Sequence, residues 1–412
     1  MFQLLVGVGP YCLCLYAVLG LGAMVFVIRQ LQKMLQQLNW EYSRTHNIPP
    51  GSLGLPFIGE TIQFMAAINS DKGFYDFVRE RSLRYGNCFK TNIFGQTHVF
   101  VRSTGSAKTI LSNELGRFTK RYIKSIAELV GNRSLLCASP HHHKLLRASL
   151  VTLFSSNSIS LLVKQFDRLI VDALSGWKMV PLSLYLMKLS RFASQKSSSL
   201  NMIKHGYLID WELNWMQITF KAMCKMLLSL ESGAELELLQ EDVGQAEQLQ
   251  LAAKTWKKSF LSLDDLTEMP YASKVVKESL RMASVVPWFP RLVVEDCEIE
   301  GYKIKKGWNV NIDARAIHLD PTVYNEPLKF NPSRFDDENC CKPYSFLAFG
   351  MGARTCLGIN MAKAMMLVFL HRLLTTYEWK VKDSDSSTEK WALFSRLRSG
   401  CPVQVTRISN IQ

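Results

Sequence analysis

The chain has 412 residues, 48% of them hydrophobic, which is enough to bury a large core in one domain or two. Its formal net charge is +14, but it has no long Lys/Arg run and no nucleic-acid motif. This argues against nucleic acid as a partner and favours anionic lipid or an acidic protein. The ten cysteines form no CxxC pair and no regular framework, which argues for reduced thiols in the cytosol rather than a disulfide scaffold.

The N-terminus predicts a membrane anchor. Residues 2–28 contain no charged side chain, and as a helix they would span roughly 40 Å, enough to cross a bilayer. Positive charges begin only at Arg29, so the positive-inside rule places the rest of the chain in the cytosol. A cleavable signal peptide is the alternative, but the apolar stretch is too long for one and no charged region precedes it. We expect a transmembrane signal anchor over residues 1–28 and a basic, proline-rich linker over 29–56.

Residues 57–412 predict an α+β domain that is mostly helical. Helical spacing occurs at 74–85. Residues 88–101 predict a β-hairpin that turns at Gly95-Gln96, and further strands with tight turns are expected within 297–312.

Three consecutive histidines follow Pro140 and could be taken for a metal site. Consecutive side chains on a helix diverge, however, so they cannot all bind one ion. The spacing instead places His143 and Arg147 at i and i+4 on one helix face. An ordinary basic helix face would look the same.

The middle of the chain has an unusual sequence. Residues 177–217 show no steady helical or strand period. Farther on, Asp242-Val243-Gly244 runs directly into Gln-Ala-Glu-Gln-Leu, as though an internal block had been removed near 244–245.

A helix is predicted from about residue 267 to 284, with a proline near its first turn, where the missing N–H costs little. It carries Glu278 and Arg281 at i and i+3. Taken alone, such a pair is usually a solvated surface ion pair of small value. Arg334 follows in the proline-bearing loop 330–335.

Residues 349–358 read Phe-Gly-Met-Gly-Ala-Arg-Thr-Cys-Leu-Gly and precede an apolar helix pattern at 360–376. The glycines let the backbone approach a ligand closely. The N–H groups of the turn and the helix N-terminus favour a thiolate at Cys356. Arg354 can reach a carboxylate on the rim of a flat, anionic metallocofactor. The alternative is a buried structural cysteine, the usual role of a lone Cys in an intracellular chain.

The pattern Phe-x-x-Gly-x-Arg-x-Cys-x-Gly, which starts at Phe349, resembles the haem-ligand loop of cytochrome P-450 monooxygenases. Glu-x-x-Arg, Pro-x-Arg-Phe and the cysteine loop also follow one another in that family's order. The resemblance covers residues 45–150 and 262–405. It implies the cytochrome P-450 fold with small β-sheets, a haem b cofactor, and Cys356 as the axial thiolate ligand of the iron.

The resemblance also implies roles for the charged residues. Glu278, Arg281 and Arg334 would form a three-way salt bridge that stabilises the haem-side core, because buried charges need full pairing. The residues implied to contact the haem or its propionates are Cys356, Arg354, Phe349, His143, Arg147 and Arg291.

One element of the family is absent from the sequence. The oxygen-activating helix on the distal side of the haem carries Ala/Gly-Gly-x-Asp/Glu-Thr-Thr, whose acid and hydroxyl groups relay protons to bound oxygen. No such string occurs in this chain: the run Ser-Gly-Ala-Glu at 232–235 lacks the threonines, and the Thr-Thr pair at 375–376 lies beyond the cysteine. We therefore expect the distal helix to be missing, and no catalytic residue is assigned.

Three functions remain open. The first is a single-pass monooxygenase of the endoplasmic reticulum membrane with a cytosolic domain, which receives electrons from an NADPH-dependent reductase and hydroxylates a hydrophobic terpenoid- or carotenoid-derived molecule. The sequence around Cys356 resembles that of the plant clan of brassinosteroid, gibberellin, abscisic-acid and strigolactone-pathway oxidases. The second, favoured for this chain as written, is a non-catalytic or partially active truncated variant that retains proximal haem binding. The third, a membrane scaffold without a cofactor, would leave the cysteine loop without a purpose.

Overall fold

The computed structural model is mostly helical and has three sheets within the residues it describes. It describes residues 9–55, 58–70, 73–113, 116–120, 128, 131, 134–175, 244–255, 258, 260–336, 342–381 and 403–408. The segment predicted to be atypical, 177–217, lies outside these residues, as does the sequence immediately before Gly244. The predicted α+β, mostly helical class is confirmed for the described part of the chain.

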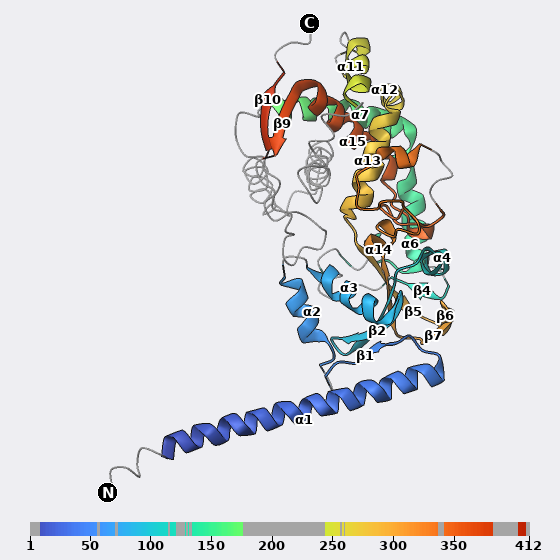
Figure 1. The fold of residues 1–412 in the computed structure, drawn as a ribbon. Helices are drawn as coiled ribbons and strands as arrows, with labels where there is room; N and C mark the ends of the chain where they lie inside the picture. The colour runs from blue at the N-terminus through green and yellow to red at the C-terminus, as the bar shows by residue number, and fades with distance from the viewer. Residues whose placement is uncertain are drawn as a thin grey trace, which may run out of the picture.

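The described helices are interspersed with strands along the chain (Figure 1). They are α1 (Gly9–His46), α2 (Thr61–Ile68), α3 (Phe74–Tyr85), α4 (Thr104–Ser112), α6 (Pro140–Leu150), α7 (Ser156–Ser175), α11 (Gly244–Thr255), α12 (Leu263–Thr267), α13 (Pro270–Ala283), α14 (Ala314–His318) and α15 (Ile359–Thr376), with the 3₁₀ turns η1 (Val151–Phe154), η2 (Pro332–Phe335) and η4 (Gly352–Arg354). The helices predicted at 74–85, 267–284 and 360–376 are present as α3, α13 and α15. Both α6 and α13 begin with a proline, where the ring fits the first turn.

The largest sheet has six strands in the order β1-β2-β3-β8-β5-β4. The strands of the chain are β1 (Gly51–Ser52), β2 (Cys88–Ile93), β3 (Gln96–Val101), β4 (Phe118–Thr119), β5 (Trp288–Val293), β6 (Cys297–Ile299), β7 (Tyr302–Ile304), β8 (Asn309–Asp313), β9 (Tyr377–Val381) and β10 (Val403–Arg407). β3 pairs with β8 in parallel, which joins the N-terminal hairpin to a segment about two hundred residues farther on. The strands predicted within 297–312 are confirmed as β6, β7 and β8.

The predicted hairpin forms, but its turn lies one residue earlier than expected. Ile93 pairs with Gln96, so Phe94 and Gly95 make the turn rather than Gly95 and Gln96. Both turn residues have positive φ, 51° and 72°, as a two-residue turn that matches the twist of the strands requires. A bulky aromatic residue in this conformation is uncommon, which explains why the sequence did not reveal the position.

Helix α1 continues past residue 28 to His46, so the first part of the predicted linker is helical. Val18–His46 is the one helical segment among the described residues that is by itself long and apolar enough to cross a membrane. The consecutive helices Pro140–Phe154 and Ser156–Asp172 meet that criterion only if they count as one span, although they are bent by 58°. Figure 1 shows α1 extending well beyond the sheet.

The C-terminal end of α1 is bonded to the sheet. The side-chain amide of Asn39 donates to the carbonyl of Gly51 in β1 at 2.8 Å. The ammonium group of Lys90, buried in β2, donates to the hydroxyl of Ser43 at 2.8 Å. α1 therefore contributes to the packing of the domain as well as projecting from it.

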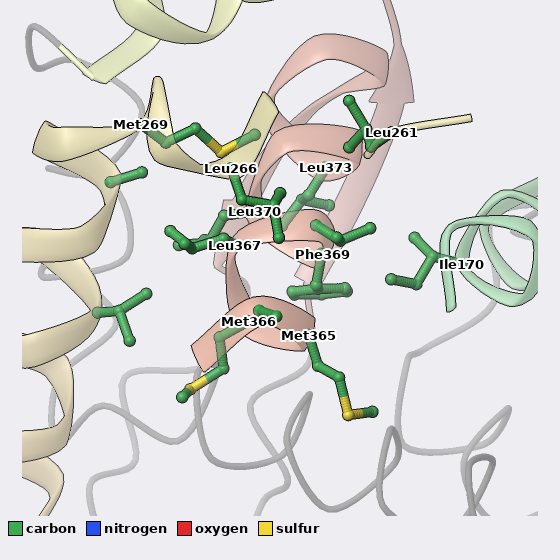
Figure 2. Packing of buried hydrophobic residues seen from close by; sticks show 14 of the residues in the cluster. Ile170, Leu261, Leu266, Met269, Met365, Met366, Leu367, Phe369, Leu370 and Leu373 are labelled. Carbon is green, nitrogen blue, oxygen red and sulfur yellow. The ribbon is translucent and has the colours of Figure 1, made fainter. Parts of the chain in front are cut away.

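The helical core surrounds α15. Figure 2 shows Leu370 of α15 beside Leu266, Leu373 on the side of Leu261 and Phe369 on the side of Ile170, whereas Met365 and Met366 point toward the opposite end of the cluster. An ion pair joins α7 to α15: both guanidinium contacts of Arg372 with the Asp167 carboxylate are 2.6 Å long. Asp167 also accepts the N–H of Leu261 at 2.7 Å. The apolar core and this ion pair fix α15, the helix that follows the cysteine loop.

Candidate functional site

The cysteine loop leaves Cys356 exposed at its end, immediately before α15. The N–H of Cys356 donates to the carbonyl of Phe349 at 2.9 Å and closes the loop. Gly350 and Gly352 have φ of 70° and 82°, a conformation in which a side chain would be strained. The loop is thus held by its own backbone, and the thiol is accessible to a ligand.

Gly358 makes a close packing contact. A Cβ atom at this position would lie 3.3 Å from the ring of Phe154 in η1. The missing side chain lets the segment after Cys356 pack against η1, the turn that follows α6.

Helix α6 contacts the loop through Arg147, one member of the predicted His143–Arg147 pair. The guanidinium group of Arg147 donates to the carbonyl of Thr355, next to the cysteine, at 2.7 Å. In the opposite direction, Arg354 of the loop donates to the carbonyl of Ala138, just before α6, at 3.1 Å. The structure therefore brings Arg147, Arg354 and Cys356 together, and their contact with a haem stays a prediction. Arg147 is seen to contact the loop backbone, which the sequence did not predict.

His143 lies buried among positive charges. Burial, followed by the charges of Arg354 and Arg147, lowers the pKa of His143 from 6.5 to about 4. Lys120 acts in the same direction. Arg354, Arg147 and Lys120 thus place positive charge around His143, which stays neutral at physiological pH, and Arg147 contacts the residue next to Cys356. Such a group of donors suits the carboxylates of an anionic cofactor.

The remaining predicted haem contacts lie near the loop. Phe349 is partly buried and packs against the helical core. Arg291 is buried in β5, where it donates to the carbonyl of Pro290 at 2.8 Å. The neighbouring Phe289 would lie 3.8 Å from a Cβ atom on Gly350, so β5 runs beside the loop. The part of Arg291 in the site stays a prediction.

Glu278 forms a three-way ion cluster with Arg281 and Arg334, and the side chains of Glu278 and Arg281 have no exposed surface. Arg281 makes two bonds to the carboxylate, of 2.7 and 2.8 Å, and Arg334 makes one of 3.0 Å. The Asn331 N–H is a fourth donor at 3.0 Å. The predicted three-way salt bridge is therefore present in the structure.

Sequence reasoning missed two neighbours of this cluster. The ring of Tyr324, which is buried, lies 5.1 Å from the Arg281 guanidinium and 6.0 Å from that of Arg334. The carbonyl of His318 accepts a bond from Arg281 at 2.7 Å. Both residues come from the segment between β8 and η2. No periodicity there distinguished them from surface residues.

Comparison with known proteins decides the family. The model of the family described as Cytochrome P450 matches residues 49–180 and 240–401, well over half of the chain. The chain belongs to the cytochrome P450 family. Abscisic acid 8'-hydroxylase 4 of Arabidopsis thaliana is 26% identical to this P450, over 88% of this chain and 93% of the relative. The 3beta,22alpha-dihydroxysteroid 3-dehydrogenase of the same plant is 30% identical, over 83% and 89%.

A solved structure has the same fold. Retinoic acid-bound cyanobacterial CYP120A1 superposes with a TM-score of 0.69 at 22% identity, over 88% of this chain and 99% of that one. The family match leaves residues 181–239 uncovered. The alignment with abscisic acid 8'-hydroxylase 4 runs over 442 positions, whereas 88% of 412 residues is about 363. About 79 positions of that alignment, the difference between 442 and 363, therefore have no counterpart in this P450.

The cofactor of this family is a haem whose iron is bound by a cysteine thiolate. The residues of this P450 fit that group: an accessible thiol ends the loop, and Arg354, Arg147 and Lys120 supply positive charge around His143.

Replacing Glu278 with glutamine is expected to destabilise this P450 by about 3–5 kcal/mol, because two buried arginines then lose their counter-charge. Urea unfolding of the detergent-solubilised chain, followed by tryptophan fluorescence, measures the change. Glu268→Gln is the matched control: the exposed Lys254–Glu268 pair should contribute less than about 1 kcal/mol. Equal effects of the two substitutions would contradict the buried cluster.

The lowered pKa of His143 predicts a loss of stability on acidification. Between pH 6.5 and about 4 the unfolded chain binds a proton on this imidazole and the folded chain does not. Each step down in pH across this window therefore favours unfolding. His143→Gln should make the slope of unfolding free energy against pH shallower in the haem-free protein, measured by urea titration. His142→Gln, at the exposed neighbouring position, is the matched control, and an equally shallow slope in both variants would contradict the assignment to His143.

Proposed function

We propose that this P450 binds haem through Cys356 and that its α6 and loop residues hold the propionates. The exposed thiol at the end of a loop bonded to α6 carries the proposal. The bound haem supplies the chemistry of the family, activation of O₂ and transfer of one oxygen atom to a substrate. Arg354 and Arg147 contribute positive charge at the rim, and Phe349 contributes apolar surface.

The proposed substrate is a hydrophobic terpenoid- or carotenoid-derived molecule, which would be hydroxylated. Several relatives are named abscisic acid 8'-hydroxylases, and one is named for a dihydroxysteroid. We propose that α1 anchors the chain in the endoplasmic reticulum membrane with the domain in the cytosol. An NADPH-dependent reductase would supply electrons there, and the net charge of +14 suits an acidic partner.

A second candidate function is a truncated, non-catalytic or partially active variant that retains haem binding. It is favoured by the roughly 79 alignment positions without a counterpart and by the unmatched residues 181–239. This is the interval in which the family's distal helix is expected. The absence of its acid and threonine residues would remove proton delivery to the oxygen site. The cysteine loop, α6 and the ion cluster lie outside the interval.

Haem ligation is tested by the absorption spectrum of the reduced, CO-bound protein. The wild-type chain should show the red-shifted Soret band of thiolate ligation, and Cys356→Ser should lose it. Cys297→Ser is the control, because that thiol lies in β6 and should leave the band intact. A wild-type spectrum without the thiolate band would refute the proposed cofactor site.

Turnover separates the two candidate functions. With reductase, NADPH and abscisic acid, we expect this chain to form product at least about 100-fold more slowly than abscisic acid 8'-hydroxylase 4 assayed in parallel. A factor of about 100 is the lower end of the rate loss expected when a general acid–base group is missing. Product would be quantified by mass spectrometry at equal haem content. A rate comparable to that of the relative would eliminate the truncated-variant proposal.

A further inference from the structure

His318 is a buried imidazole with both ring nitrogens engaged. The Leu347 N–H donates to Nε2 at 2.8 Å, and Nδ1 lies 2.8 Å from the hydroxyl of Ser284. Because a backbone N–H can only donate, Nε2 carries no proton, and Nδ1–H donates to Ser284. Ser284 in turn donates to the carbonyl of Arg281 at 2.9 Å. These contacts select one neutral tautomer of the ring.

The surroundings oppose protonation of this ring. Burial, followed by the charge of Arg281, lowers the pKa of His318 to about 3. Nε2 therefore remains a hydrogen-bond acceptor throughout the physiological pH range. The contact with Leu347 does not switch with pH.

The same residue contacts the buried ion cluster through its backbone. Its carbonyl accepts the 2.7 Å bond from Arg281, whose other nitrogens hold Glu278. One residue at the end of α14 thus bonds to the cluster through its peptide group and to Leu347 through its ring. Phe346 packs against that ring, with centroids 5.7 Å apart.

Leu347 begins a chain of backbone bonds that reaches the cysteine. It is fully buried, and its carbonyl accepts the Gly350 N–H at 2.9 Å. Phe349, within that turn, accepts the N–H of Cys356 at 2.9 Å. A displacement of Leu347 would therefore be transmitted to the turn that carries the thiol.

Ser284 adopts an unusual conformation at the end of α13. It has φ 38° and ψ 56°, in the left-handed region where glycine is the usual residue at a helix C-terminus. A serine in this conformation has a strained backbone, and its hydroxyl lies between the carbonyl of Arg281 and the ring of His318. Position 284 therefore carries a serine, whose hydroxyl bonds to the His318 ring, rather than the glycine that the end of a helix favours.

We propose that His318 is a positioning residue that couples the Glu278–Arg281–Arg334 cluster to the cysteine loop, so that the geometry of Cys356 depends on its imidazole. The proposal rests on the proposed haem site at Cys356. Its first test uses haem-free protein and is independent of that site.

Another buried histidine distinguishes this role from ordinary packing. His371 of α15 is 1% exposed and bonds to Gln248 at 2.8 Å. This ring contact leads to α11, on the side of α15 away from the bond between His318 and Leu347. His371→Phe is therefore a matched control for the loss of a buried imidazole.

The experiment measures hydrogen exchange of the Leu347 amide in the full-length, detergent-solubilised chain without haem. In His318→Phe the amide should exchange at least roughly tenfold faster, as expected on loss of a hydrogen bond. In His318→Gln, whose side-chain oxygen can accept the same N–H, exchange should stay near the wild-type rate. His371→Phe should leave it unchanged.

Ser284→Gly tests the proposal without threatening the fold, because glycine adopts the left-handed conformation readily. It removes the acceptor of Nδ1–H, so exchange at Leu347 should accelerate while helix α13 keeps its length. If His318→Phe does not fold, the exchange rate of the Leu347 amide in Ser284→Gly, compared with that in His318→Gln, still tests the proposal. Unchanged Leu347 exchange in Ser284→Gly and in folded His318→Phe, or equal acceleration in His371→Phe, would overturn the proposal.

A second readout uses the haem-loaded chain. The thiolate-type fraction of the reduced CO complex should fall in His318→Phe, recover in His318→Gln and remain unchanged in His371→Phe. An unchanged fraction in a His318→Phe protein with accelerated exchange would overturn the link to Cys356. A wild-type chain without the thiolate band would refute the haem site, and the exchange measurements would still decide whether His318 holds the loop.

Discussion

The buried carboxylate of Glu278 is the constraint on which the cysteine-bearing half of the molecule depends. An unpaired charge in this interior would be very costly, and it is compensated by Arg281 on the same helix and Arg334 on a distant loop. The loop must therefore fold back so that Arg334 and the Asn331 N–H reach the carboxylate. Electrostatics thus adds to the apolar contacts of Phe330 and Phe335 in joining this segment to α13 and the core.

The cysteine loop is held from two directions. His318 bonds to Leu347, two residues before the loop, on the side of the ion cluster, and Arg147 bonds to the loop at Thr355, on the side of α6. Cys356 follows the second contact by one residue. Its position is therefore set by elements separated by more than one hundred residues in the chain, and the local glycines only permit the conformation that these contacts select.

The sequence predicted the parts of the structure that depend on local patterns. The helix beginning at Pro270 and the hairpin strands follow from apolar spacing and turn residues, although the turn itself shifted onto Phe94. Spacing alone indicated an exposed Glu278–Arg281 pair, and only the family resemblance indicated a buried cluster. His318 could not be predicted because its partners come from three separate segments. The distal helix is untested, since residues 176–243, immediately before α11, lie outside the described part of the chain.

Helix α1 has a consequence for how the protein meets a bilayer. Asn39 and Ser43 bond it to the edge of the sheet, and the helix runs without a break toward its apolar end. A helix in a membrane tilts to match the thickness of the hydrocarbon layer. If α1 spans a bilayer as proposed, that tilt would be transmitted to the sheet through these bonds, so lipid thickness would help to set which face of the domain is turned toward the membrane surface.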